Sequence, residues 1–188
     1  MLTCEFPLPK GRGLRLLCLG AHSDDIEIGC GGTILRLLRE HRGSTASWIV
    51  FAANAERRAE AEKSARQVLK NAARADIRVM DFKESYFPYA GGAIKAFFES
   101  LKKGAAPDII FTHYRHDLHQ DHRLLSELTW NTFRDHLVLE YEVMKYDGDL
   151  GAPNFFVRLD QRTARRKVSH ILRSFPSQKA HPWEIWGH

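Results

Sequence analysis

Short apolar runs that alternate with longer helix-like segments constrain the fold of this chain more than any other feature of its sequence. Each run is rich in Leu, Ile, Val or Phe, and the four runs cover residues 14–21, 45–52, 76–82 and 108–113. Between the runs, apolar residues recur at helical spacing, as Ile34, Leu37 and Leu38 do. This order predicts an α/β fold with an open, mostly parallel sheet and helices on both of its faces.

The sequence pattern after Arg134 indicates an extra strand region and a last helix. Residues 137–146 (LVLEYEVMKY) and 154–159 (NFFVRL) are interpreted as strands that extend the sheet or form a β-rich edge, and residues 161–175 as a helix. No internal repeat or long linker separates two domains, and 188 residues suffice for one core. We therefore expect a single domain over residues 1–188, with its core at about 14–178.

Charge and cysteine content leave several classes of protein open. The chain has 28 Lys and Arg against 23 Asp and Glu, and this formal charge of +5 is too mild to decide between an anionic substrate and nucleic acid. The three cysteines, Cys4, Cys18 and Cys30, show no C-x-x-C spacing, which fits a reducing compartment. The first residues lack an apolar signal core, and no apolar run is long enough to cross a bilayer. We expect a cytoplasmic protein without stable membrane insertion.

Two clusters of polar residues follow two of the predicted strands. His22, Asp24 and Asp25 come directly after the first strand, and the fourth strand ends at His113 before the stretch YRHDLHQDHR. Ionised Asp is rarely buried unless it is paired or binds a metal, so packing alone does not explain this placement. Because ligands of open α/β sheets bind outside the carboxyl ends of the strands, we expect the two clusters to meet at one edge of the sheet.

The residue types in the two clusters suit a catalytic metal ion. His119 and His122 are three residues apart at the predicted start of a helix, so both imidazoles can face one pocket. Two histidines with one or two aspartates form a plausible zinc site, and these ligands also allow iron, cobalt or manganese. Zinc lowers the pKa of bound water and polarises a carbonyl, and a neighbouring carboxylate can then accept the proton of that water. One of two adjacent aspartates can bind the ion while the other acts as this base.

These motifs resemble those of a known family. AHSDD at residues 21–25 and DLHQDH at 117–122 look like the A-H-P-D-D and H-x-D-H motifs of the LmbE/PIG-L superfamily of metal-dependent de-N-acetylases. RRAEA at 57–61 looks like the R-x-x-E-A helix start of that family, and the resemblance covers residues from about 14 to about 178. It implies that His22, Asp25 and His122 bind Zn²⁺.

The same resemblance assigns the remaining roles in the site. Asp24 is implied as the general base, and His119 as the group that stabilises the oxyanion or protonates the leaving amine. Asp121 is expected behind His119, where it sets the charge and orientation of that imidazole, and Arg57 is expected to point into the substrate pocket. Ser23 stands where the family usually has proline, which removes a fixed φ angle but no ligand.

Several further residues are weaker candidates for the pocket. His113, His116 and His181 are candidates for lining it, and Asp117 is interpreted as a residue that fixes the loop rather than as a ligand. Two aromatic residues near the end of the chain, Trp183 and Trp186, either cover a sugar face or pack on the last helix. Many relatives continue beyond the last residues of this chain, so either a wall of the substrate pocket is missing or a neighbouring subunit of a homo-oligomer supplies it.

The leading hypothesis is a hydrolase that removes acetyl from an N-acetylated amino sugar. A substrate that carries phosphate, such as a sugar nucleotide or a glycolipid precursor, would suit Arg57 and the mild positive charge. The alternative is a Rossmann-like dinucleotide-binding module, although the first βα turn lacks G-x-G-x-x-G and its two carboxylates would repel a pyrophosphate. RTARRK at 162–167 could bind nucleic acid, but it is short and lacks aromatic residues, so no nucleic-acid partner is expected.

Overall fold

The predicted α/β architecture is confirmed by the computed structural model, which describes residues 11–104, 106–145 and 147–178. Five parallel strands form one sheet in the order β3-β2-β1-β4-β5. In chain order they are β1 (Arg15–Gly20), β2 (Thr45–Val50), β3 (Arg74–Val79), β4 (Ile109–His113) and β5 (Leu137–Tyr141). β2 and β3 are added on one side of β1, and β4 and β5 are added on its other side. The direction of the crossovers therefore reverses between β1 and β4.

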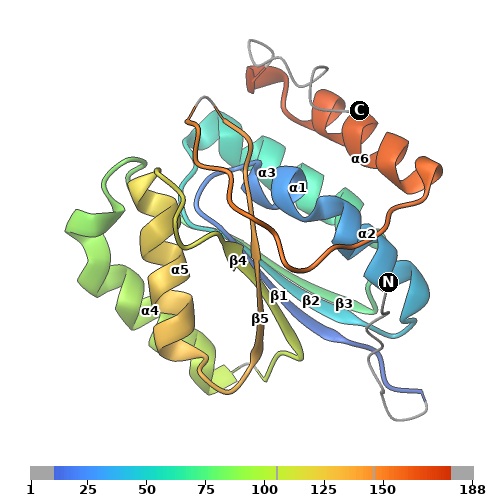
Figure 1. Cartoon of the computed structure of the whole chain (residues 1–188), viewed down its shortest axis with the longest axis horizontal. Helices are drawn as coiled ribbons and strands as arrows, with labels where there is room; N and C mark the ends of the chain where they lie inside the picture. The colour runs from blue at the N-terminus through green and yellow to red at the C-terminus, as the bar shows by residue number, and fades with distance from the viewer. Residues whose placement is uncertain (1–10, 105, 146, 179–188) are drawn as a thin grey trace.

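Helices cover both faces of this sheet. The helices are α1 (Asp25–Gly29), α2 (Gly31–Glu40), α3 (Ala55–Val68), α4 (Gly91–Gly104), α5 (Gln120–Thr132) and α6 (Gln161–Ser174), and the short 3₁₀ helices are η1 (Leu69–Asn71), η2 (Phe87–Ala90) and η3 (Pro176–Gln178). Figure 1 shows α4 and α5 on one face, with α1, α2 and α3 on the other and α6 packed outside them. No helix in the described part of the chain is both long and apolar enough to cross a membrane.

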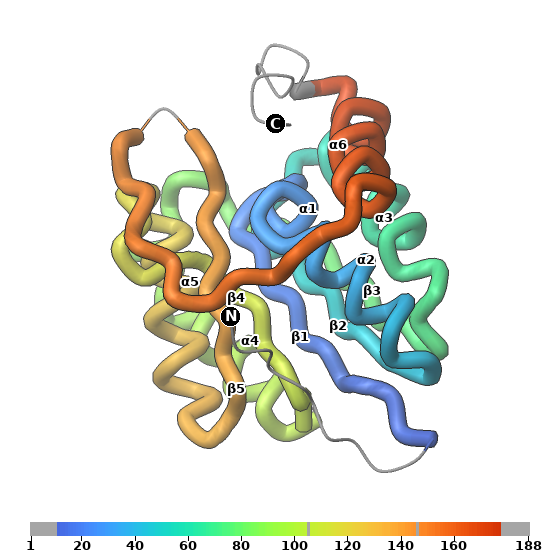
Figure 2. The backbone as a smooth tube through the Cα atoms, turned by 45° about the vertical axis from the view of Figure 1, so that its right-hand side comes forward, coloured from blue at the N-terminus to red at the C-terminus, as the bar shows by residue number. Residues whose placement is uncertain are grey.

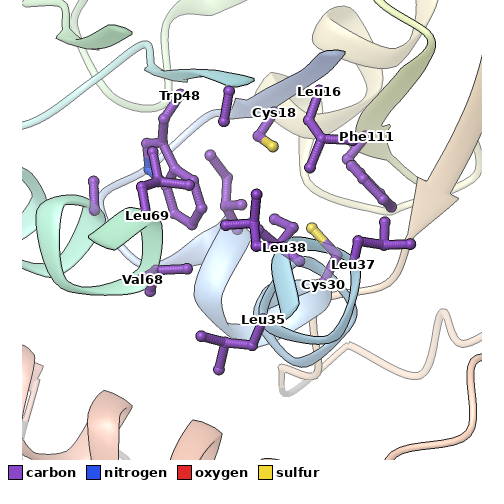
Figure 3. Close-up of a cluster of buried hydrophobic side chains, with 14 of the residues drawn as sticks. Leu16, Cys18, Cys30, Leu35, Leu37, Leu38, Trp48, Val68, Leu69 and Phe111 are labelled. Carbon is purple, nitrogen blue, oxygen red and sulfur yellow. The ribbon is translucent and has the colours of Figure 1, made fainter. Parts of the chain in front are cut away.

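Two buried clusters, one on each face, hold the layers together. Side chains alternate along a strand, so Leu16 and Cys18 of β1 face one cluster while Leu17 and Leu19 face the other. The first cluster lies between the sheet and helices α2 and α3 and includes the fully buried Trp48, which lies beside Leu69 (Figure 3). The second lies under α4 and α5 and is rich in phenylalanine. Because β1 is buried on both sides, residues that follow it directly have rigid support.

One predicted element is wrong and others differ in length. No strand forms over residues 154–159, which lie in an extended segment that crosses from the β5 side of the sheet to α6 (Figure 2). The apolar residues of this segment indicated a strand, but its backbone has no paired neighbour, and the exposed fractions of Phe155 and Phe156 are 42% and 71%. Of the predicted strand 137–146, only Leu137–Tyr141 pairs with β4. The other strands start and end within three residues of the predicted bounds.

The contact between Gly29 and Tyr141 gives a stability prediction. A Cβ atom at Gly29 would lie 2.0 Å from the Tyr141 ring, and that ring is held in place because its hydroxyl donates a 2.7 Å hydrogen bond to the Leu19 carbonyl. We expect Gly29→Ala to lower the free energy of unfolding by about 1–3 kcal/mol. Urea denaturation measures this, with Gly92→Ala as the control, since a Cβ there meets nothing within 4 Å. Equal stability of Gly29→Ala and the parent chain would contradict the prediction.

Candidate metal centre and active site

The two polar clusters of the sequence meet where the direction of the crossovers reverses. His22, Asp24 and Asp25 occupy the turn after β1 and the start of α1, while His119 and His122 lie at the start of α5, which follows β4. Parallel strands end at the same edge, and β1 and β4 are neighbours, so residues nearly a hundred positions apart come into contact. The expected meeting of the clusters is therefore present in the structure.

Three donor atoms form a small triangle at the centre of this cluster. The Nδ1 atom of His22 lies 3.4 Å from Oδ2 of Asp25 and 3.2 Å from Nε2 of His122, and the latter two atoms are 3.4 Å apart. In a tetrahedral zinc site with Zn–N bonds of about 2.0–2.1 Å, two ligands lie about 3.3 Å from each other. All three residues are buried. The donor set and its spacing therefore fit zinc.

A second layer of carboxylates fixes both imidazoles. The Nδ1–H of His122 donates to Oδ2 of Asp117 over 2.9 Å, and the Nε2–H of His22 donates to Oδ2 of Asp121 over 3.2 Å. Each imidazole therefore turns its other nitrogen toward the triangle, where a metal ion would take the place of a proton. Carboxylates commonly support metal-binding histidines in this way.

The position of Asp121 corrects the sequence-based interpretation. We expected its carboxylate behind His119, but that carboxylate contacts His22 and also accepts hydrogen bonds from the backbone N–H groups of Ser85 (2.6 Å) and Phe87 (3.1 Å). His119 is the N-cap of α5, and its Nδ1 atom accepts a 3.2 Å hydrogen bond from the backbone N–H of Asp121. The first turn of α5 directs the Asp121 side chain toward the β1 turn. Asp121 still acts on His119, because its backbone N–H holds the imidazole and its charge partly offsets the lowering of the His119 pKa by burial.

Residues that the sequence did not single out also support the cluster. Lys145 contacts Asp117 at 2.9 Å and Asp149 at 2.6 Å, and Asp149 accepts the backbone N–H of Leu118. Ser85, which lies next to the site, has a φ of 66°, a left-handed backbone conformation that is rare outside glycine. These contacts come from loops after β3 and β5, and no spacing in the sequence indicates them.

Two other histidines of the cluster use their nitrogens elsewhere. Nε2 of His113 accepts a 2.9 Å hydrogen bond from the backbone N–H of Ala21, so its lone pair is occupied although Asp25 lies only 3.3 Å away. Nδ1 of His119 is occupied by the backbone N–H of Asp121, which leaves a proton on Nε2. Both histidines belong to groups of residues close enough to hold a metal ion, but their hydrogen bonds favour His22, Asp25 and His122 as the ligands.

The electrostatic field of the cluster favours positive charge at the triangle. Burial alone would lower the pKa of His22, but Asp25 and Asp121 raise it to about 10. Burial alone would raise the pKa of Asp25, but the neighbouring histidines, His122 first, hold it well below its usual range. Burial lowers the pKa of His119, so this imidazole is neutral near pH 7. The same field that stabilises an imidazolium here would stabilise a divalent cation.

Asp24 differs from Asp25 although the two are adjacent. Burial and then the charge of Asp25 raise the pKa of Asp24 to about 7. Its side chain is buried, with a residue exposure of only 8%. A carboxylate whose pKa lies near 7 suits proton transfer at neutral pH.

Arg57 lies in the first turn of α3, beside the site. Asn54 caps this helix by accepting the backbone N–H of Arg57, and Nη1 of Arg57 lies 3.4 Å from Oε2 of Glu84. The charge of Arg57 also acts on Asp24, which it tends to keep ionised. Of the weaker candidates, Asp117 contacts His122, and His116 is exposed. His181, Trp183 and Trp186 lie outside the described residues.

The fold and the site together define a three-layer α/β protein with a candidate metal centre between the ends of β1 and β4. Residues 17–133, more than half of the chain, match the GlcNAc-PI de-N-acetylase (PIG-L) family. The chain belongs to this family, which confirms the resemblance of the two motifs. Family membership supports N-deacetylase activity.

Solved structures share the fold of this chain. N,N'-diacetylchitobiose deacetylase from Pyrococcus horikoshii is 22% identical, with a TM-score of 0.65 over 92% of this chain and 75% of that chain. The A40926 pseudoaglycone deacetylase Dbv21 is 17% identical, with a TM-score of 0.69 over 91% and 86%. The 4-carboxy-2-hydroxymuconate hydratase GalB from Pseudomonas putida is 16% identical, with a TM-score of 0.65 over 92% and 82%. The fold therefore carries deacetylases and also a hydratase.

Proposed function

We propose that this chain is a zinc-dependent N-deacetylase that acts in the cytoplasm on an amino-sugar substrate. Residues 1–188 would form one catalytic domain, with His22, Asp25 and His122 as the metal ligands. The observation that carries the proposal is the triangle of three donor atoms, spaced at 3.2–3.4 Å, with the buried Asp24 beside it. Family membership and the deacetylases of the same fold support the reaction class.

The residues around the triangle divide the work of amide hydrolysis. A bound zinc ion would polarise the amide carbonyl and lower the pKa of a water molecule. Asp24 accepts a proton from the attacking water, whose oxygen forms a bond to the carbonyl carbon. The Nε2–H of His119 donates a hydrogen bond to the carbonyl oxygen as negative charge develops there. When the C–N bond breaks, Asp24 gives the proton that it accepted to the leaving nitrogen, so that a free amine leaves and the acid product leaves as acetate after it loses its proton to solvent.

The substrate in this proposal is an N-acetylglucosamine conjugate. The name of the matching family supports an N-acetylglucosamine group, and Arg57 beside the site suits a phosphate in a nucleotide- or lipid-linked substrate. The buried carboxylates of Asp24 and Asp25 at the end of β1 disfavour binding of a dinucleotide, because they would repel the negative charge of its pyrophosphate.

Metal analysis and an acetate-release screen test the proposal. We expect about one zinc ion per chain by elemental analysis, and acetate release from at least one of N-acetylglucosamine, N,N'-diacetylchitobiose and a nucleotide-linked N-acetylglucosamine. A chelator should abolish this release, and added zinc should restore it. Full activity in the chelator would disprove the metal dependence. Hydration of 4-carboxy-2-hydroxymuconate without acetate release from any of the sugars would place the chain in the other reaction class of this fold.

A further inference from the structure

A cavity that is separate from the candidate metal centre lies beside β5. It has a volume of about 740 Å³ and lies between β5, the extended segment 152–159, the junction of α1 and α2, and Lys167 of α6. Figure 2 shows that segment 152–159 passes in front of this junction on its way to α6. None of the five proposed metal-binding and catalytic residues, His22, Asp24, Asp25, His119 and His122, lines the cavity. Tyr141 does line it, and the hydroxyl of Tyr141 reaches Leu19 and His113 on the side of the metal centre.

A large part of the cavity wall is apolar. Six of its side chains come from four different parts of the chain and are aliphatic or aromatic: Phe111, Trp130, Leu139, Phe155, Val157 and Leu159. Phe155 and Phe156 are largely exposed, although side chains of this size usually pack against apolar neighbours. The volume also lies in the range of about 300–1,000 Å³ that is usual for small-molecule sites.

Lys167 is one of four Lys, Arg, Asp or Glu side chains that line the cavity. The stem of Lys167 packs near Gly32, so that its Cδ atom would lie 3.5 Å from a Cβ at that glycine. Burial lowers the pKa of Lys167, and no carboxylate of residues 11–104, 106–145 and 147–178 offsets that effect. A partly buried ammonium group without a counter-ion is unfavourable.

The other charged residues that line the cavity already have partners. Arg115 forms an ion pair with Glu140 at 2.6 Å, and Glu142 accepts the backbone N–H of Gly151. Lys167 is therefore the lining cation for which the described chain supplies no anion.

We propose that this cavity binds a small anionic amphiphile, with its carboxylate or phosphate at the Lys167 ammonium and its apolar part between β5 and segment 152–159. The anionic group supplies the counter-ion that Lys167 lacks, and the apolar part covers Phe155 and its neighbours. This site is separate from the metal centre, so the inference does not depend on the deacetylase proposal.

Calorimetric titration of the intact chain with decanoate, decyl phosphate and the uncharged decanol tests this site. We expect one molecule per chain for at least one of the two anions, bound at least about tenfold more tightly than decanol. Binding of decanoate alone would identify a carboxylate ligand, and binding of decyl phosphate alone a phosphate ligand. Equal binding of decanol and both anions, or no binding of any of them, would overturn the proposal.

Variants locate the bound molecule. Lys167→Met should weaken binding of the anion at least about tenfold and leave decanol binding unchanged, because it removes the charge and keeps the apolar stem. Lys103→Met is the matched control, since Lys103 is exposed on α4 and outside the cavity. Val157→Trp should fill the cavity and remove binding of the anion, and circular dichroism checks the fold of each variant. Unchanged binding of the anion in either Lys167→Met or Val157→Trp would show that the cavity is not its site.

Discussion

Replacing His122 with alanine should weaken zinc binding by more than about 100-fold, because loss of a ligand exceeds the 10–100-fold effect usual for loss of a supporting residue. The Nε2 atom of His122 is one corner of the donor triangle, and Asp117 fixes the imidazole from the other side. Metal competition with a chromophoric chelator measures the affinity, and elemental analysis gives the stoichiometry. Deacetylase activity should fall with the metal content.

Two other histidine variants make this test selective. His119→Ala should keep one metal ion per chain, because Nδ1 of His119 is engaged by the backbone N–H of Asp121 and its Nε2 carries the proton. His116→Ala is the neutral control, since His116 is exposed and outside the cluster. If His119→Ala lost the metal while His122→Ala kept it, the assigned ligand set would be wrong.

Asp24→Asn should reduce turnover by about 10²–10⁴-fold while the metal content stays at the level of the parent chain. Asparagine has the shape of aspartate but accepts no proton near neutral pH, and the triangle of His22, Asp25 and His122 does not include position 24. Rates of acetate release at saturating substrate, together with elemental analysis of the same samples, measure both quantities.

The Asp24→Asn result can contradict the proposed roles in two ways. Full turnover would show that Asp24 is not the base. Loss of the metal ion would show that its carboxylate takes part in binding the ion.

The fold could be predicted where burial dominates. β1, β2 and β4 are apolar and buried over most of their lengths, so their sequences indicate them within two residues. β3 lies at the edge of the sheet, and only one of its residues is buried. The apolar run at 76–82 therefore did not indicate its start at Arg74. Segment 154–159 has strand-like composition, but a strand needs a paired neighbour and composition does not show one.

The meeting of the two clusters could be predicted because it follows from strand direction alone. The partners of individual side chains could not, since they depend on how loops fold back. Asp121 lies two residues from His119 in the sequence, yet its carboxylate binds His22 and the backbone at Ser85 and Phe87. Lys145 reaches Asp117 from beyond β5, and no motif in the sequence connects these two residues.

The reversal of crossover direction between β1 and β4 separates the proposed metal ligands from the connections in which insertions are tolerated. All proposed ligands lie in the connections that leave these two central strands or in the first turns of the helices that follow, and they rest on the buried core. The connections after β2, β3 and β5 supply none of the three ligands, although Arg57, Ser85 and Lys145 from these connections act on residues of the site. Insertions in these outer connections can change which substrates reach the site, while the positions of the metal ligands stay the same. Substrate selectivity and metal binding therefore depend on different parts of the chain.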